Sequence, residues 1–201
     1  MFYIVGLGNP GKEYENTRHN TGAMVLDVFR ETYNLPEWTP EKKRNALVSE
    51  GKVGKEKVLL IFPQTFMNKS GNSVSQIKDL RFKIKDKKKQ VENLVVIHDD
   101  LDIPFGSYKI SFNKSSGGHH GVDSIIKVTK TQAFVRVRVG IASSASVVKK
   151  SQDEKTVEKV ILGHFTPDQV KGLKKLAKNI AEGLEVLVNE GKEKAMSQYH
   201  A

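Results

Sequence analysis

The chain begins with a short apolar run, residues 2–5, that passes directly into the glycine-rich stretch GLGNPG at positions 6–11. Gly6, Gly8 and Gly11 have the spacing of a dinucleotide-binding loop, in which a strand ends and a helix begins at a bound pyrophosphate. The same letters occur wherever a strand must end in a tight turn. The rest of the chain therefore decides whether this stretch binds a nucleotide or shapes a turn.

Two features argue against the nucleotide interpretation. A dinucleotide loop is followed by an acidic residue ~20 positions further on, at the end of a second strand. The nearest candidate here, Asp27, lies inside an expected helix. Pro10 also lacks the backbone N–H that such a loop donates to phosphate. A nucleotide-dependent oxidoreductase is therefore disfavoured, and a thermal shift with NAD would reveal one.

Composition limits the remaining classes of function. The 201 residues are enough for a sizeable core, and we expect a single domain over residues 1–201. The absence of Cys excludes disulfide scaffolds, Cys-based zinc sites and thiol catalysis. No apolar stretch approaches the ~20 residues of a membrane span, and the opening MFYIVG lacks the basic segment and cleavage site of a signal peptide. We therefore expect no association with a membrane.

The net charge of the chain is +10, from 33 Lys plus Arg against 23 Asp plus Glu. A basic excess of this size favours a polyanionic partner such as a nucleic acid. An ordinary lysine-rich, solvated surface explains the same excess equally well, so charge alone leaves both interpretations open.

Strand and helix patterns alternate along the chain. Apolar or alternating runs predict strands at 46–53, 57–62, 93–98, 108–112 and 133–142, with a hairpin turn at 54–56. Helical spacing predicts helices at 21–33, 74–80, 122–130 and 166–190. Residues 83–92 are expected to be a basic connection, and 143–155 a polar, mobile one. This order predicts one α/β domain with a mixed, mostly parallel twisted sheet flanked by helices.

Two of these elements have detailed signatures. Thr166 and Gln169 form a capping box, Pro167 takes the first helical position, and Gly191 ends the last helix. In the strand at 133–142 valines alternate with Arg136 and Arg138, which predicts a half-buried strand with a basic face.

Polar stretches follow four of the expected strands: GNPGKEYENTRHN, PQTFMNKSG, HDDLDIPFG and NKSSGGHHG. Ligands of open α/β sheets bind beyond the carboxyl ends of the strands. We therefore expect these four loops to converge on one cleft. They offer it the side chains of Asn9, His19, Asn20, Asn68, Asp99, Asn113, His119 and His120.

The stretches GLGNPGKEYENTRHNTG, FPQTFMNKSG, HDDLDIPFG and SSGGHHGVDSI resemble, in order and spacing, the bacterial-type peptidyl-tRNA hydrolases. FVRVRVGI and the closing helix also fit, so the resemblance covers about residues 2–199. Four blocks in series are far more specific than any one of them. The resemblance implies a single α/β domain with a mixed sheet, and it makes the opening glycines a tight strand-exit turn that presents Asn9 to the cleft.

The resemblance also implies an activity. This family hydrolyses the ester between a peptide and the 3′ end of a tRNA, without a metal or an organic cofactor, and its members are usually monomeric and cytoplasmic. The implied partner is peptidyl-tRNA, and no membrane, metal or cofactor is expected. A non-catalytic RNA-binding relative is the alternative, because this fold has been reused in that way. The presence of His19, Asp99, Asn9 and Asn68 argues against it.

His19, in TRHN, matches the catalytic His of the family. Its ordinary pKa of ~6.5 suits a general base near neutral pH. Asp99 matches the carboxylate that fixes the tautomer of that imidazole and stabilises its charged form. Strand alternation points Asp99 and Asp100 in opposite directions. We therefore expect Asp100 and Asp102 to make loop hydrogen bonds or to face solvent.

Asn9 and Asn68 match residues that line the cleft in the family. An amide can donate to a carbonyl or an oxyanion and accept from a water. We expect Asn68 on the oxyanion side and Asn9 at the peptide or the water, although Asn is also common in plain turns. Asn20 is expected to brace the loop beside His19.

Four further residues complete the expected substrate site: Met67, Phe66, Tyr14 and His119. Met67 and Phe66 would floor a peptide pocket, although Phe66 fits a core position equally well. His120 is a departure, because the family usually has Asn there; a neutral His still donates and accepts one hydrogen bond. We expect no metal at His119 and His120, since adjacent residues rarely bind one ion together.

The resemblance places Arg138 at the 5′ phosphate of the tRNA. A second family cation falls on Ser111 in this chain, which is another departure. Lys109 and Lys114 are the expected substitutes, with a solvated lysine face as the alternative. Residues 87–89 are expected to be a solvated loop.

Overall fold

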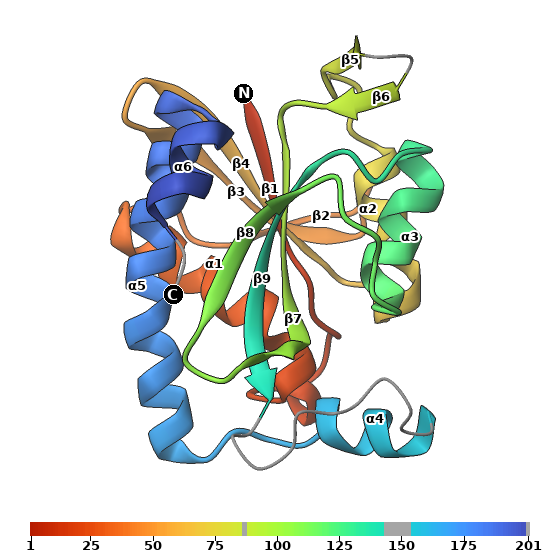
Figure 1. Cartoon of the computed structure of the whole chain (residues 1–201), viewed down its shortest axis with the longest axis vertical. Coiled ribbons are helices and arrows are strands. Elements are labelled where there is room, and N and C mark those ends of the chain that lie inside the picture. The colour runs from red at the N-terminus through yellow and green to blue at the C-terminus, as the bar shows by residue number, and fades with distance from the viewer. Residues whose placement is uncertain (86–87, 143–153, 200–201) are drawn as a thin grey trace.

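A seven-stranded sheet forms the centre of this computed structural model, which describes residues 1–85, 88–142 and 154–199 (Figure 1). The strand order is β2-β3-β4-β1-β7-β9-β8. The strands are β1 (Phe2–Gly6), β2 (Thr39–Glu41), β3 (Ala46–Val53), β4 (Glu56–Pro63), β7 (Leu94–Pro104), β8 (Tyr108–Phe112) and β9 (Val135–Ala142). The helices are α1 (Thr21–Thr32), α2 (Gly71–Ser75), α3 (His120–Thr129), α4 (Glu154–Ile161), α5 (Pro167–Glu190) and α6 (Lys192–Gln198).

The direction of the strands confirms the mixed, mostly parallel sheet. The four central strands β4, β1, β7 and β9 are parallel, while β3 and β8 run against their neighbours. Because β2 is antiparallel to β3, it runs with the central group. The fold is therefore a single-domain α/β architecture, as the alternation of strand and helix patterns predicts.

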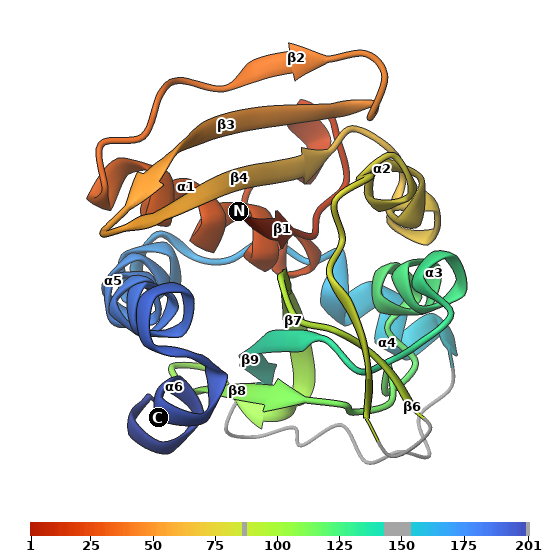
Figure 2. The same ribbon diagram turned by 90° about the horizontal axis from the view of Figure 1, so that it is seen from above.

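Helices cover both faces of the sheet (Figure 2). One face packs against α1, α5 and α6 and contains the larger core, including Val95, Ile97 and Leu184. The other face packs against α2 and α3 through residues such as Val96 and Ile125. The central strands are apolar on both faces because both faces are covered.

Helix α5 forms as its capping signals predict. The Thr166 hydroxyl accepts from the backbone N–H of Gln169 at 3.3 Å, and the Gln169 side chain accepts from the N–H of Thr166 at 3.0 Å. The helix ends at Gly191, whose φ of 101° is open to glycine. No described helix is long and apolar enough to span a bilayer.

Three local expectations need correction. The strand expected at 93–98 continues to Pro104, because Asp99 and Asp100 still pair with β9. The helix expected at 74–80 begins earlier, where the N–H of Gly71 donates to the Ser124 hydroxyl at 2.9 Å, and it ends at Ser75.

The third correction is the basic connection, part of which forms a two-stranded hairpin, β5 (Phe82–Lys85) and β6 (Lys88–Val91). Its base is held by the N–H of Glu92 donating to the carbonyl of Arg81 at 3.0 Å. Residues 86–87 lie outside the described part of the chain, and so do 143–153 of the polar segment. The end of that segment is helical, because α4 begins at Glu154.

Candidate active site

The opening glycines let α1 approach the ends of the central strands closely. A Cβ on Gly6 would lie 2.6 Å from the carbonyl oxygen of Gly22, and a Cβ on Gly22 would lie 2.2 Å from that of Ile97. Gly11, at a φ of +111°, makes the turn after this contact. These glycines therefore serve close packing and a tight turn, and they carry the chain between β1 and α1 past the end of β7.

His19 lies in that connection, on the 3-10 turn η2 (Arg18–Asn20), and its side chain is buried. The N–H of Arg18 donates to the carbonyl of Gly163 at 3.0 Å, and the N–H of Phe165 donates to that of Asn16 at 2.9 Å. The guanidinium of Arg18 also stacks over the Phe165 ring at 5.5 Å. The segment before α5 thus fixes the position of His19.

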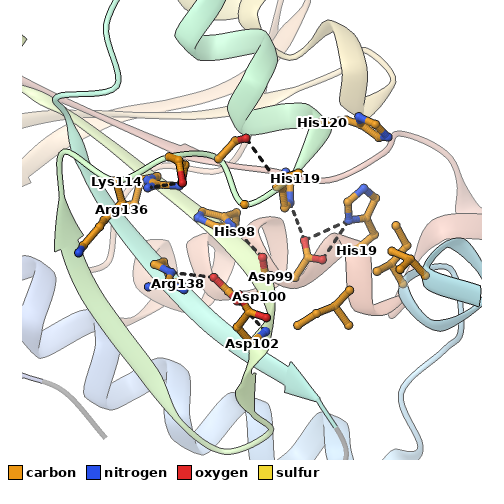
Figure 3. Close-up of a pocket in the computed structure, with 17 residues that line it drawn as sticks. His19, His98, Asp99, Asp100, Asp102, Lys114, His119, His120, Arg136 and Arg138 are labelled. Carbon is orange, nitrogen blue, oxygen red and sulfur yellow. Dashed lines mark hydrogen bonds and ion pairs between the residues drawn. The ribbon is translucent and has the colours of Figure 1, made fainter. Parts of the chain in front are cut away.

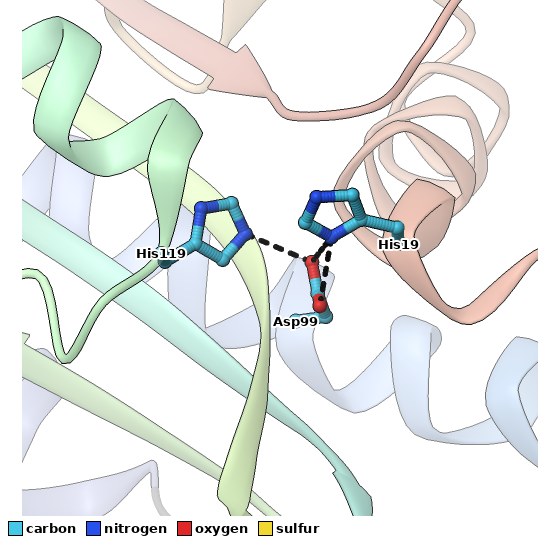
Figure 4. Close-up of side chains that lie close together, drawn as sticks. All are labelled: His19, Asp99 and His119. Atoms are coloured by element: carbon cyan, nitrogen blue, oxygen red, sulfur yellow. Dashed lines mark hydrogen bonds and ion pairs between the residues drawn. The ribbon is translucent and has the colours of Figure 1, made fainter. Parts of the chain in front are cut away.

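Asp99 lies between two imidazoles (Figure 4). Nδ1 of His19 is 3.1 Å from both carboxylate oxygens, and Nε2 of His119 is 2.9 Å from Oδ1. Because a carboxylate only accepts, Nδ1 of His19 is assigned the proton. Nε2 of His19 has no partner among the described residues and is left with a free lone pair. This is the arrangement that a general base requires.

The charges of this cluster stabilise one another. Burial disfavours the charged form of His19, but the charge and hydrogen bonds of Asp99 outweigh burial and raise the pKa of His19 above its ordinary value. Burial would raise the pKa of Asp99, but His19 and His119 hold the pKa of this carboxyl well below its ordinary value. The carboxylate is therefore ionised at neutral pH.

His98 lies behind His119, with the two ring centroids 4.8 Å apart. Nδ1 of His98 donates to the backbone carbonyl of Asp99 at 2.7 Å, and Nε2 is buried with no partner among the described residues. Burial, followed by His119 and the cation Arg136, lowers the pKa of His98 well below its ordinary value. His98 is therefore a neutral part of the wall.

Asp100 belongs to a different contact, as strand alternation predicts. Its carboxylate accepts from Nε of Arg138 at 2.7 Å and from the N–H of Asp102 at 2.8 Å (Figure 3). Arg136, expected on the same exposed face as Arg138, is buried instead. Its Nη2 donates to the carbonyl of Ser115 at 2.9 Å, because the loop that follows β8 covers it.

That loop explains how a fourth polar stretch reaches the site. Because β8 is antiparallel to β9, it ends beside Val135, at the start of β9 and at the end of the sheet opposite the site. The chain then returns toward the carboxyl ends of the central strands, passes Arg136, and begins α3 at His120. The four polar stretches converge as expected, although the last one leaves its strand from the far end. Its Asn113, expected in the cleft, is exposed and is not part of the lining.

Two hollows meet at His19. The first, which we call the glycine-loop cavity, has a volume of about 260 Å³ and includes Asp99, Lys114, Gly117, Arg136 and Arg138 in its lining (Figure 3). The second, which we call the Phe66 cleft, has a volume of about 460 Å³ and is lined by Asn9, Tyr14, Phe66, Met67, Asn68, Lys155, Val157, Glu158, Ile161 and Leu162. His19 and His120 line both. A group bound at His19 can therefore extend in two directions.

The Phe66 cleft brings together the expected peptide-side residues. Oδ1 of Asn9 accepts from the N–H of Met67 at 2.8 Å, so the amide NH₂ of Asn9 is the end that remains for a ligand. Asn20 braces this loop, because its side chain accepts from the N–H of Asn9 and donates to the carbonyl of Asn9. Phe66 is 59% exposed and meets Tyr14 edge-on at 6.4 Å, which excludes the core position for Phe66.

The remaining candidates are at the surface. Asn68 and His120 are exposed, and neither side chain has a hydrogen bond within the described chain. Lys109 is opposite Arg138 in the β8–β9 pair, and Lys114 lines the glycine-loop cavity. Both lysines are exposed and have no ion-pair partner among the described residues. Ser111 is buried opposite Arg136.

Sequence reasoning missed two parts of this site. Helix α4 supplies Val157 and Ile161 to both hollows, and its apolar spacing was the available signal. His98 and Arg136 form the back of the glycine-loop cavity. Only the pairing of β7 with β9 reveals this, because in sequence both residues look like parts of ordinary strands.

An α/β domain with an imidazole–carboxylate pair in a cleft at the carboxyl edge of its sheet has the arrangement of an enzyme. The family model described as peptidyl-tRNA hydrolase matches residues 3–201. The chain therefore belongs to the peptidyl-tRNA hydrolase family, a family of hydrolases.

Individual relatives match along nearly their whole length. A peptidyl-tRNA hydrolase of Geotalea uraniireducens is 41% identical over 197 residues, which cover 98% of this chain and 95% of that protein. One of Thermodesulfovibrio yellowstonii is 38% identical over 200 residues, covering 100% and 99%. The crystal structure of the Acinetobacter baumannii peptidyl-tRNA hydrolase has a TM-score of 0.81 and 27% identity, and the match covers 98% of this chain and 93% of that one.

Proposed function

We propose that the protein hydrolyses the ester that joins the peptide to the tRNA in peptidyl-tRNA, with His19 as the general base. The observation that carries the proposal is the free Nε2 of His19, held by Asp99 at the junction of two hollows. A two-sided substrate needs such a junction, because its scissile ester has a peptide on one side and a nucleotide on the other. Membership of the family supports the same substrate.

The reaction requires two proton transfers at one nitrogen. Nε2 of His19 takes a proton from a water, whose oxygen attacks the ester carbonyl to form a tetrahedral oxyanion. As this intermediate collapses, the bond to the ribose oxygen breaks and that oxygen receives the proton back from Nε2. Asp99 stabilises the imidazolium between the two steps and keeps the proton of Nδ1 in place. The products are the free peptide and the free tRNA.

The Phe66 cleft is the proposed peptide side. The exposed amide of Asn68 is the donor to the oxyanion, and the NH₂ of Asn9 contacts the peptide or the attacking water. Phe66, Met67 and Tyr14 provide apolar contacts for the peptide. His120, which lines both hollows, is at the boundary of the two sides.

The cationic face at β8 and β9 is the proposed tRNA side. Arg138 is held by Asp100, and near it lie Lys109 and Lys114, whose ammonium groups have no ion-pair partner in the described part of the chain. Phosphate contacts made by such groups position a nucleic acid and weaken with salt. Arg138 is the proposed contact to the 5′ phosphate of the tRNA, with the two lysines beside it.

We also propose that the protein is a cytoplasmic monomer that needs no metal and no organic cofactor. The donor atoms of His19, Asp99 and His119 lie within 4.8 Å of one another, a spacing that would also admit a cation. Hydrogen bonds account for each of these atoms without one. Retention of full activity after exhaustive dialysis against EDTA supports the metal-free reaction, whereas loss of activity restored by one divalent ion contradicts it.

Release of tRNA from an N-acetylated aminoacyl-tRNA tests the function. We expect multiple turnover at enzyme concentrations far below that of the substrate. Binding of this tRNA without release would identify the non-catalytic RNA-binding alternative instead. The same substrate joined through an amide in place of the ester is the matched control for binding.

A further inference from the structure

The two ring nitrogens of His119 have different partners. Nδ1 lies 3.2 Å and 3.4 Å from the backbone nitrogens of Gly121 and Val122, at the start of α3. Nε2 lies 2.9 Å from Oδ1 of Asp99. His119 therefore caps a helix with one nitrogen and contacts the catalytic carboxylate with the other. Neither nitrogen is left to bind a substrate.

These partners assign the tautomer of His119. A backbone N–H can only donate, so Nδ1 must present a lone pair to Gly121 and Val122. The ring proton is then on Nε2, and it is donated to Asp99. A second proton on Nδ1 would point an N–H at two other N–H groups, at the positive end of the helix dipole. The start of α3 thus selects a neutral ring.

We propose that His119 is a positioning residue for the reaction: α3 fixes it as the neutral Nε2–H tautomer, which orients Asp99 by a hydrogen bond and adds no second positive charge beside His19. The effect of His119 on the reaction rests on the proposed function, whereas the assignment of its tautomer rests on the hydrogen bonds alone.

The neutrality of His119 matters because the two rings are close. The ring centroids of His19 and His119 are 5.0 Å apart, and both rings share one carboxylate. A cationic His119 would compete with the imidazolium that forms on His19 for the charge of Asp99. The other groups around His119 are the neutral His98 on β7 and, beyond it, the cation Arg136 on β9. Asp99 is the anion that contacts both rings.

Two substitutions separate the roles of the two nitrogens. The Nε2 of Gln is as many bonds from Cα as the Nε2 of His, so His119→Gln keeps a donor for Asp99 and loses the helix cap. The Oδ1 of Asn matches Nδ1 in the same way, so His119→Asn keeps the cap and loses the donor. We expect kcat of His119→Asn to fall about ten- to hundredfold, the loss typical when a hydrogen-bond partner that orients a metal-binding side chain is removed, with little change in KM.

The pH profile of kcat is a second measurement, because a simple loss of structure would not move its acid limb. With one donor fewer, Asp99 holds the proton of His19 more strongly, so the acid limb of kcat for His119→Asn moves to higher pH. His119→Gln should be at least several-fold more active than His119→Asn, with an acid limb like that of the parent, while its Tm falls because the cap is lost. Equal activities of the two variants, or parent-like activity of His119→Asn, would overturn the proposal.

A spectroscopic measurement on the unmodified protein does not depend on either variant. Long-range ¹H–¹⁵N correlations of the His119 ring should show a protonated Nε2 and an unprotonated Nδ1 at neutral pH. A proton on Nδ1, or on both nitrogens, would contradict the inference even if both variants fail to fold. The result also stands apart from the proposed function, because it requires no substrate.

Discussion

The adjacent carboxylates of β7 are used in opposite ways. Asp99 is buried between His19 and His119, and every polar atom it contacts has a fixed role. Asp100 holds Arg138 at the surface, where the arginine side chain is still 22% exposed and two nearby lysines have no ion-pair partner among the residues that the structure describes. A buried network depends on each of its members, whereas exposed charges in water replace one another at little cost. We therefore expect substitutions on the Asp99 side to have large, specific effects on activity. Substitutions on the Asp100 side should have small, additive effects on tRNA binding.

Removal of the base should have the largest effect. His19→Ala leaves no group to accept the proton of the attacking water, so kcat should fall ~10²–10⁴-fold. The measurement is release of tRNA from N-acetylated aminoacyl-tRNA, with the Tm as a check on folding. His164→Ala, which removes an exposed imidazole from the segment that supports His19, is the matched control. Near-parental activity of His19→Ala would refute the mechanism.

Asp99→Asn should have the next largest effect, on rate more than on substrate binding. The carboxylate raises the pKa of His19, so the parent loses activity as the pH falls through a value above ~6.5, the ordinary value for His. Without that charge the pKa of His19 drops, and the acid limb of kcat/KM moves to lower pH while the maximum falls. Profiles from about pH 5 to 8 measure this.

Asp102→Asn removes an exposed carboxylate from the same strand without a contact to His19, and its profile should match that of the parent. An unchanged acid limb in Asp99→Asn would show that Asp99 does not set the charge of His19.

The same contrast separates what the sequence predicts from what only the structure shows. Apolar periodicity predicts the central strands, α1, α3 and α5, because each buries one face or both. It fails where burial is decided by a distant segment. Arg136 reads as half of an exposed basic face, but the loop after β8 covers it. The acidic run reads as the end of a strand, but β7 continues because Asp99 and Asp100 still pair with β9, where Asp100 also meets the cation Arg138.

The candidate site is also only partly predictable, because distant segments decide some of its contacts. His19 and Asp99 are recognisable from motifs, and the structure brings them together across 80 positions of sequence. The contact of His119 with Asp99 is not predictable, because it depends on β8 being antiparallel and on the return of its loop. Helix α4 is missed because its apolar residues are few and lie in a strongly charged stretch.

On the Asp100 side, Arg138→Ala should weaken tRNA binding modestly. Each lost phosphate contact should reduce the slope of log affinity against log salt by ~0.7–0.9. Hydrolysis of a short 3′ fragment that lacks the 5′ phosphate should be spared. Lys175→Ala, which removes an exposed charge on α5 outside both hollows, is the control and should leave the slope closer to that of the parent. If Arg138→Ala keeps the parental slope, Arg138 does not belong to the interface.

The smallest effects should come from His120, whose exposed side chain lines both hollows and has no hydrogen bond within the described chain. A positive charge on this ring would oppose the charge that develops on His19. His120→Asn keeps a neutral hydrogen-bonding group, so it should stay active and extend activity further toward acid pH. His120→Ala removes a cleft contact without replacement and should lose a few-fold in kcat/KM, on the scale of one neutral hydrogen bond. The two variants are compared with the parent from about pH 5 to 8. Three superimposable profiles would mean that His120 faces solvent and has no part in the reaction, and that His19, Val157 and Ile161 are the residues that matter where the two hollows meet.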